Sequence, residues 1–291
     1  MAGRTLWLVA AALALSVTPG LSAAADEAAV KRGGYLLKAA GCESCHTDVK
    51  NNGPPLAGGR ALPTPFGTFF GKNITPDRTG IGGWSEEQFH DALRNGIDDD
   101  GHYLFPVFPF PSYTGMTNAD ISDLYAYLMA QKPVAQRNKR QEAKFPFGFR
   151  PLLYFWRLLF FKPGPLEPVA GQSEEWNRGR YLAEAVAHCQ ECHTPRNVLG
   201  ALDRNHPYAG NPDGPDGQKA PNVTSDEQTG IGKWSLAELE TLLTSGETPD
   251  HQDIGSGMGE VVNATSALTE SDRHSIAVYI KSLPPLRATG K

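Results

Sequence analysis

The chain has 291 residues, of which 20% are charged, and its formal net charge is −5 at pH 7. No basic stripe accompanies this acidic balance, so the electrostatic footprint of a nucleic-acid-binding protein is missing. The length suits two domains of typical small size.

Residues 1–25 have the pattern of a secretory signal peptide. Arg4 provides a short positive region, residues 6–17 form an apolar core, and the small residues at 21–25 offer a cleavage site. The core is short for a membrane span, which favours cleavage, and a retained anchor is the alternative. We expect the bacterial periplasm as the location, with the protein either free or attached to the surface of the inner membrane.

Two copies of the pattern C-x-x-C-H follow, one beginning at Cys42 and the other at Cys189, and together they use all four cysteines. This pattern is typical of covalent haem c attachment, because two thiols at this spacing add to the two vinyl groups of one haem. The adjoining histidine then presents a ring nitrogen to the iron. The sequence therefore predicts two haem c groups, attached through Cys42, Cys45, Cys189 and Cys192, with His46 and His193 as axial ligands.

Two other uses of paired cysteines fit less well. A zinc site would need all four thiolates in one place and would leave the two histidines without a role. A redox disulfide usually uses a single C-x-x-C pair near a βαβ pattern, and this sequence has no such pattern.

The rest of the chain also repeats. The sequence around Asn73 returns around Asn222, and Thr-Gly-Ile-Gly-x-Trp-Ser occurs at both 79–85 and 229–235. Such a repeat indicates two copies of one fold. We therefore divide the mature chain into a first domain (26–132), a connecting segment (133–172) and a second domain (173–291).

Local signals make both domains helical. Four helices have an N-cap residue followed three positions later by a partner for it. These pairs are Ser85 and Gln88, Thr117 and Asp120, Ser235 and Glu238, and Thr269 and Asp272. Gly96 and Gly246 end the helices that begin at the two serines. Alternating strand patterns are nearly absent, so we expect an all-α fold without a sheet.

Three glycines precede the haem motifs at matching places, namely Gly33, Gly34 and Gly179. They either allow the first and last helices of each domain to cross closely or only loosen the helix starts. We expect the close crossing.

The sixth iron ligand is expected from a methionine or histidine near the last helix of each domain. Met258 lies in a glycine-rich stretch at 255–259, predicted to be a loop, and is the predicted ligand in the second domain. In the first domain the prediction is Met116, although its place before an N-cap also suits a hydrophobic staple. His102 is the alternative ligand there, and an open or water-bound iron is the third choice.

The connecting segment is rich in aromatic residues at 145–161. This stretch suits a membrane surface or a partner subunit, with Arg157 and Lys162 held near the interface. The alternative is that it packs across the domain junction and makes one rigid body.

These features resemble the cytochrome c subunits of membrane-associated periplasmic dehydrogenases that act on alcohols, gluconate and aldehydes. The resemblance rests on the haem motifs, the Trp-Ser repeats and residues 105–113, 145–161 and 173–199, and it covers nearly the whole mature chain. It implies two tandem class I cytochrome c-like domains, each built around one covalently bound haem. It also implies a catalytic subunit as electron donor and a quinone or terminal acceptor.

The sequence departs from that family in two places. Family subunits commonly have three haem motifs, whereas this chain has two. Many members also place methionine where Phe108 stands, so the resemblance supplies no sixth ligand for the first haem at that position.

The leading hypothesis is therefore an electron-transfer protein, or a subunit of an oxidoreductase complex, without catalytic residues of its own. The alternative is a dihaem enzyme of the thiosulfate dehydrogenase or peroxidase type, with an open haem in the first domain. A third hypothesis is a docking module whose main role lies in the aromatic segment.

Overall fold

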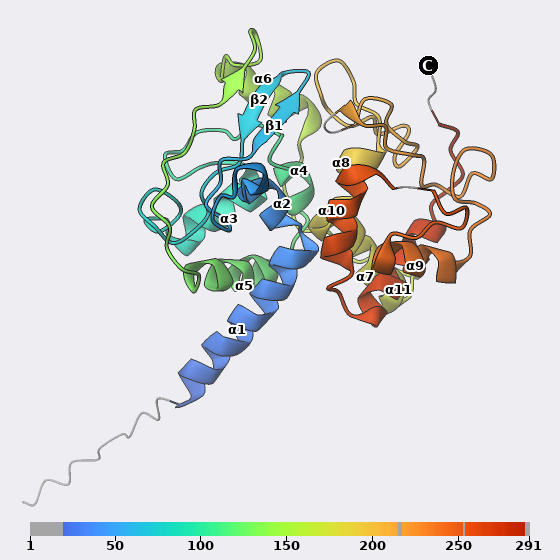
Figure 1. Ribbon diagram of the computed structural model, residues 1–291, viewed down its shortest axis with the longest axis horizontal. Helices are drawn as coiled ribbons and strands as arrows, with labels where there is room; N and C mark the ends of the chain where they lie inside the picture. Colours follow the sequence, from blue (N-terminus) through green and yellow to red (C-terminus); the bar gives the residue numbers. More distant parts are fainter. Residues whose placement is uncertain (1–19, 215–216, 253, 289–291) are drawn as a thin grey trace, which may run out of the picture.

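The computed structural model describes residues 20–288 except 215, 216 and 253 (Figure 1). The apolar core of the predicted signal peptide, residues 6–17, lies outside the described residues. Among the helices that the structure does describe, none is long and apolar enough to cross a membrane. Helices supply most of the regular structure, which confirms the helical fold class.

The elements from α1 to α5 form the first unit of the structure. In chain order they are α1 (Gly20–Ala39), α2 (Cys42–His46), the 3₁₀ turn η1 (Val49–Asn51), β1 (Ala61–Thr64), β2 (Gly67–Phe70), α3 (Glu86–Asn95), α4 (Phe110–Tyr113) and α5 (Asn118–Met129). The connecting segment adds β3 (Glu142–Ala143) and α6 (Pro151–Phe160).

The second unit runs from α7 to α11. Its elements are α7 (Glu174–Tyr181), the π-helical turn η2 (Leu182–Val186), α8 (Gln190–His193), α9 (Leu236–Ser245), α10 (Gly255–Thr265) and α11 (Glu270–Lys281). In Figure 1 the short helices α2 and α4 of the first unit face α8 and α10 of the second at the centre of the molecule.

The helix boundaries agree with the predicted start and stop signals. Ser85 begins α3 and Ser235 begins α9, each through a reciprocal capping box with the residue three positions later. Both helices end at a glycine in the left-handed conformation, Gly96 with φ 60° and Gly246 with φ 78°. The local sequence therefore determines where these helices begin and end.

The first and last helices of each unit cross at the predicted glycines. α5 begins at its N-cap Thr117 and packs against α1, and α11 begins at Thr269 and packs against α7. A Cβ atom on Gly33 would lie 1.9 Å from a backbone oxygen of α5, and one on Gly179 would lie 1.8 Å from a backbone oxygen of α11. The close crossing is thus confirmed for both units.

A small antiparallel sheet corrects the expectation that the fold has none. β1 and β2 form a hairpin in which Ala61 pairs with Phe70 and Thr64 pairs with Gly67, and β3 adds two residues to β2. Gly67 has a φ of 131°, which suits a residue without a side chain. The strands are short and include proline and glycine, so they show no alternating pattern in the sequence.

The π-helical turn η2 accounts for a difference of one residue in spacing between the two copies of the repeat. Ten positions separate Arg32 from Cys42 in the first unit, whereas eleven separate Arg178 from Cys189 in the second. A π-helical turn accommodates one extra residue within a helix. The second unit therefore keeps both its helix crossing and its haem motif in place despite the insertion.

One continuous hydrophobic core joins the two units. α4 packs against η2, and α1 packs against α10. The largest fully buried side chains come from both units and include Leu37, Phe110, Met116, Ile121, Leu128, Leu182, Val186 and Ile276.

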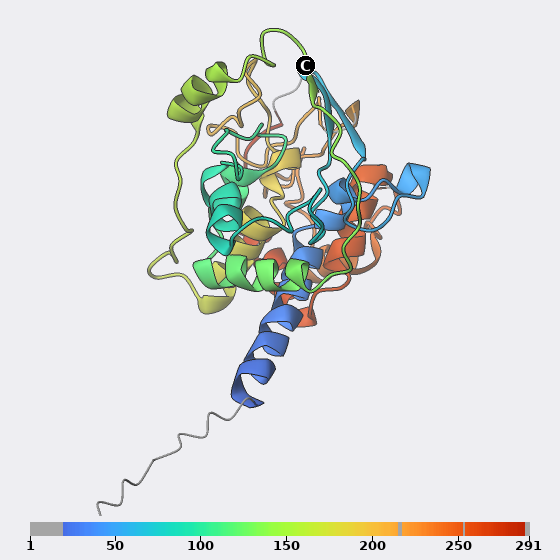
Figure 2. The same ribbon diagram turned by 90° about the vertical axis from the view of Figure 1, so that its left-hand side faces the viewer.

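The helix α6 lies at the edge of the molecule in Figure 2 and has two different faces. On one face Leu153 is buried, and the indole Nε1 of Trp156 donates to the carbonyl of Leu199, 3.0 Å away in the second unit. The aromatic segment therefore packs across the junction of the units, as one of the two hypotheses expected. The other face of α6 is exposed.

Candidate haem sites

The helix α2 carries the first motif, and its last residue is His46, which is partly buried. The Nδ1 atom of His46 lies 2.6 Å from the carbonyl oxygen of Lys72. Because a carbonyl oxygen only accepts, Nδ1 carries the proton and Nε2 keeps its lone pair. Burial also lowers the pKa of His46, so the ring is neutral. This is the tautomer and orientation that a metal-ligating histidine needs.

The second motif repeats this arrangement. The Nδ1 atom of His193 lies 2.8 Å from the carbonyl oxygen of Pro221, and burial lowers its pKa as well. The accepting carbonyls precede equivalent asparagines, Asn73 and Asn222. Each asparagine side chain anchors its loop by donating to a backbone carbonyl further along the chain. The repeated loop therefore fixes both predicted ligands through the same contact.

The four cysteines are all partly buried. Burial raises the pKa of Cys42 and of Cys189 to about 12, so these sulfurs are not thiolates at neutral pH. Within the described ranges, no three His, Cys, Asp or Glu side chains converge as a metal cluster. The zinc alternative, which needs four converging thiolates, therefore finds no support in the geometry.

A buried tyrosine lies beside the second haem motif. Tyr208 is only 2% exposed, and its hydroxyl finds no hydrogen-bond partner among the described residues. Burial raises the pKa of Tyr208 well above its ordinary value, and a negative charge on the nearby Cys189 acts in the same direction. The donor set of each motif, two cysteines and a histidine whose Nε2 keeps its lone pair, is the set that covalent haem attachment needs.

The structure gives the three candidate sixth ligands different surroundings. Met116 is completely buried, and Leu268, its equivalent in the second unit, is 5% exposed. Met258 is partly buried in the first turn of α10, so the predicted glycine-rich loop there is wrong and the segment is helical. The side chain of His102 is 59% exposed and faces Asp98 at 3.4 Å, which places it on the surface.

His188 belongs to the second site although its sequence context did not single it out. It directly precedes Cys189 and has a φ of 42°, in the left-handed region that favours glycine. The equivalent residue in the first unit is Gly41, with φ 62°. An alignment of the two repeats places His188 opposite Gly41. This mismatch is the signal in the sequence that could have singled out His188.

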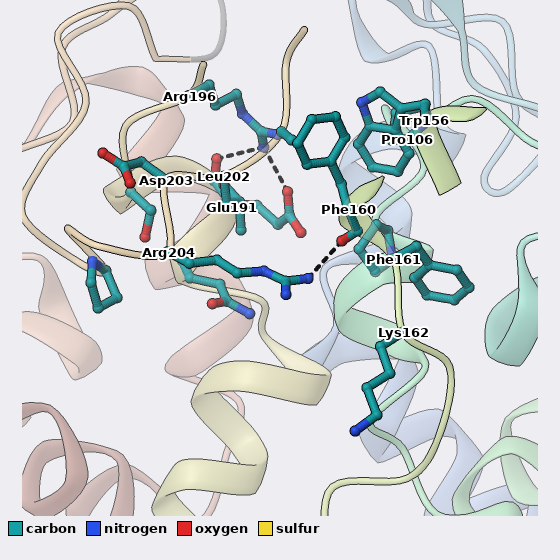
Figure 3. A pocket seen from close by; sticks show the side chains of 15 residues that line it. Pro106, Trp156, Phe160, Phe161, Lys162, Glu191, Arg196, Leu202, Asp203 and Arg204 are labelled. Atoms are coloured by element: carbon teal, nitrogen blue, oxygen red, sulfur yellow. Dashed lines mark hydrogen bonds and ion pairs between the residues drawn. The ribbon is translucent and has the colours of Figure 1, made fainter. Parts of the chain in front are cut away.

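A cleft of about 240 Å³ lies beside the second motif, between α6 and the loop after α8 (Figure 3). Glu191, inside the motif, accepts from Arg196 at 2.6 Å and from the Ser112 hydroxyl of α4 at 2.7 Å. Arg204 reaches across the cleft and donates to the carbonyl of Phe160 at 2.7 Å. These contacts tie the second motif to the first unit and to α6.

Comparison with known proteins adds to this geometry. The cytochrome c family model matches residues 30–132. A diheme cytochrome c-type protein of Cereibacter sphaeroides is 39% identical over 297 residues, which cover 98% of each chain. The chain belongs to the cytochrome c family. Its cofactor is haem c.

This cytochrome also resembles larger proteins. It is 41% identical to the cytochrome c subunit of the alcohol dehydrogenase (quinone) of Gluconacetobacter polyoxogenes, over 95% of this chain. It is 38% identical to the fructose dehydrogenase cytochrome subunit of Gluconobacter japonicus, over 92% of this chain. The chain spans 59% and 55% of the length of these two relatives. It spans 22% of the length of a nicotinate dehydrogenase subunit of Pseudomonas putida. The predicted family is therefore confirmed.

Proposed function

We propose that this cytochrome holds two haem c groups and passes single electrons from a dehydrogenase catalytic subunit to a quinone or another acceptor. The observation that carries the proposal is the duplicated histidine geometry, in which His46 and His193 each hold Nδ1 against a carbonyl and leave Nε2 for iron. Bound haem supplies reversible one-electron redox chemistry. The chain attaches the haems, orients the histidines and buries the sites.

Covalent haem content tests the number of sites. The wild-type protein is expected to hold two haems per chain in a pyridine haemochrome assay, and both Cys42→Ala/Cys45→Ala and Cys189→Ala/Cys192→Ala are expected to hold one. Haem staining after denaturing electrophoresis confirms that the remaining haem is covalent. A wild-type value of one haem per chain would contradict the proposal.

The proposed axial ligands complete each site. Met258 is the sixth ligand of the second haem, and Met116 is the sixth ligand of the first. Met116 is preferred to His102 because it is buried beside the core of the first unit, whereas His102 is on the surface. Histidine with methionine raises the potential of a haem and leaves no open coordination position, which suits electron transfer.

The dehydrogenase donor is proposed from the relatives, several of which are named as cytochrome subunits of alcohol, fructose and gluconate dehydrogenases. The direct test mixes the oxidised cytochrome with the catalytic subunits of these three dehydrogenases, each with its substrate. Reduction by one of the three, followed in a stopped-flow spectrophotometer, is the expected result. Failure of all three to reduce it would contradict this choice of donor class while leaving the haem sites intact.

We also propose a periplasmic location and attachment to an anionic membrane surface through residues 145–161. The outer face of this segment exposes large apolar side chains, with exposed fractions of 93% for Phe145, 59% for Phe155, 65% for Leu158 and 67% for Leu159. Lys144 and Lys162 flank them in the sequence, and Arg150 lies between Phe145 and Phe155. Apolar and cationic side chains together suit a bilayer with anionic headgroups.

Vesicle flotation tests the membrane proposal. The wild-type protein is expected to float with phosphatidylglycerol-containing vesicles, and Leu158→Glu/Leu159→Glu is expected to stay in solution. Val198→Glu is the matched control, because Val198 is 89% exposed but lies outside the aromatic segment. Equal flotation of the two variants would contradict a role for α6.

A further inference from the structure

His188 reaches from one haem motif to the other. Its Nε2 atom lies 3.3 Å from the carbonyl oxygen of Ala40, and because that oxygen only accepts, the imidazole donates. Ala40 lies two positions before Cys42, and His188 lies one position before Cys189. The hydrogen bond therefore joins the backbone beside one attachment cysteine to the backbone beside the other.

The backbone of His188 is held in an unfavourable conformation. At φ 42° an ordinary side chain is strained, whereas the equivalent Gly41 adopts φ 62° freely. The sequence keeps histidine where the other copy uses glycine. Strain of this kind persists where the side chain has a task, and the hydrogen bond of this side chain is the one to Ala40.

Neighbouring contacts hold the bridge in place. The Tyr113 hydroxyl also donates to the carbonyl of Ala40, at 3.3 Å, and the Tyr113 ring packs edge-on against the His188 ring with centroids 5.4 Å apart. Close by, the Ser112 hydroxyl donates to Glu191 within the second motif. The bridge thus lies in a partly buried part of the interface between the units, where Tyr113 packs against it.

We propose that His188 is the bridge through which an electron passes between the two haem attachment sites. The inference rests on the proposed function, since it requires two haems. Electronic coupling falls less steeply along bonds and hydrogen bonds than across a gap. A continuous path of this kind runs from Cys42 through Ala40 and His188 to Cys189.

The transfer itself is a balanced one-electron exchange. One electron leaves the haem at one motif, which is oxidised, and enters the haem at the other, which is reduced, while no bond forms or breaks. Burial lowers the pKa of His188, which favours the neutral ring.

Three substitutions at His188 separate the effect of losing the hydrogen bond from the effect of changing the size of the side chain. His188→Gln keeps an N–H group at the reach of Nε2, whereas His188→Leu keeps a side chain of moderate size without a donor. His188→Gly copies Gly41 and relieves the backbone strain, so it is expected to fold even where the leucine variant does not.

The measurement is a rapid partial photoreduction of the oxidised dihaem protein by a ruthenium tris-bipyridine complex. Redistribution of the electron between the haems appears as an absorbance phase whose rate does not depend on protein concentration. We expect this phase to be slower in His188→Leu and His188→Gly and close to the wild-type rate in His188→Gln. Midpoint potentials are expected to stay unchanged, which separates a loss of coupling from a change in driving force.

The outcomes distinguish this inference from the proposed function. Equal rates in wild type, His188→Leu and His188→Gly would overturn the bridge, and so would a wild-type protein with two reducible haems but no concentration-independent phase. A wild-type protein with one haem, seen in the haem assay before any kinetics, would instead overturn the proposed function.

Discussion

Tyr35 and Tyr181 occupy equivalent positions in the two units, and each donates its hydroxyl to a carboxylate of the other unit. Tyr35 donates to Asp272 at 2.6 Å, and Tyr181 donates to Asp120. Each tyrosine oxygen also accepts a hydrogen bond, at 3.1 Å, from the backbone N–H of the N-cap residue of the helix that carries that carboxylate. The two units therefore meet through a self-complementary interface, as two identical subunits do around a two-fold axis.

Loss of these hydroxyls is expected to weaken the contact between the units. Tyr35→Phe and Tyr181→Phe each remove a hydrogen bond to a carboxylate, with an expected loss of about 1.5–3 kcal/mol in the free energy of unfolding. Urea denaturation followed by circular dichroism measures it. Tyr154→Phe is the control, because Tyr154 is 47% exposed on α6. Losses no greater than that of the control would show that the reciprocal pair does not stabilise the protein.

Stability is expected to fall in acid partly through Asp272. Burial acts to raise the pKa of Asp272, but hydrogen bonds from Arg178 and Tyr35 outweigh it, so the pKa lies below its ordinary value. As the pH falls, the unfolded chain takes up this proton first, and the stabilisation present above about pH 4 is lost as the pH passes through the folded-state pKa.

The variant Asp272→Asn tests this linkage. It is expected to be less stable at neutral pH and to lose less stability between about pH 5 and pH 2 than the wild type does. The free energy of unfolding in urea, measured across that range, gives the comparison. Asp100→Asn, at an exposed position, is the control for removing one charge. An unchanged acid slope in Asp272→Asn would exclude Asp272 as a contributor.

The crossing glycines are expected to tolerate no side chain. Gly33→Ala and Gly179→Ala place a methyl group within 2 Å of a backbone oxygen, and overpacking of this kind costs about 1–3 kcal/mol or more. The thermal midpoint of each variant measures the effect. Gly83→Ala is the matched control, because a Cβ there meets nothing within 4 Å. Similar midpoints for all three variants would mean that the helices move apart without cost.

Replacing either methionine ligand by leucine is expected to have the same effect on its haem. Met258→Leu and Met116→Leu should each lower the potential of one haem and allow carbon monoxide to bind there, since each leaves an open iron. Met129→Leu, in α5, is the control and should change neither. Leucine is also the natural residue at the position equivalent to Met116, namely Leu268. A normal spectrum for Met116→Leu would therefore show that Met116 only packs.

Much of this structure can be predicted from the sequence because the chemistry involved is local. The capping box of Ser85 and Gln88 involves two residues three positions apart, so it needs no distant partner. The haem motifs are equally local, since the cysteines and the histidine of each lie within one short helix and its N-cap residue. The repeat then extends each local prediction to the second unit.

Features that depend on distant contacts are not visible in this way. Tyr35 and Asp272 are 237 positions apart, and neither has a local pattern that pairs them. The glycines around Met258 are typical of a loop. The segment nevertheless forms the helix α10, which packs against α9 and α1. The strands β1 and β2 likewise depend on their pairing rather than on an alternating sequence.

The most direct test of the central claim is a spectroscopic redox titration of the purified protein, with haem content determined on the same sample. The account predicts two haem c groups per chain, each reduced and reoxidised reversibly by one electron, and no change in the reduced spectrum on adding carbon monoxide. One haem per chain, or a haem that binds carbon monoxide, would contradict a dihaem electron carrier with both irons fully ligated.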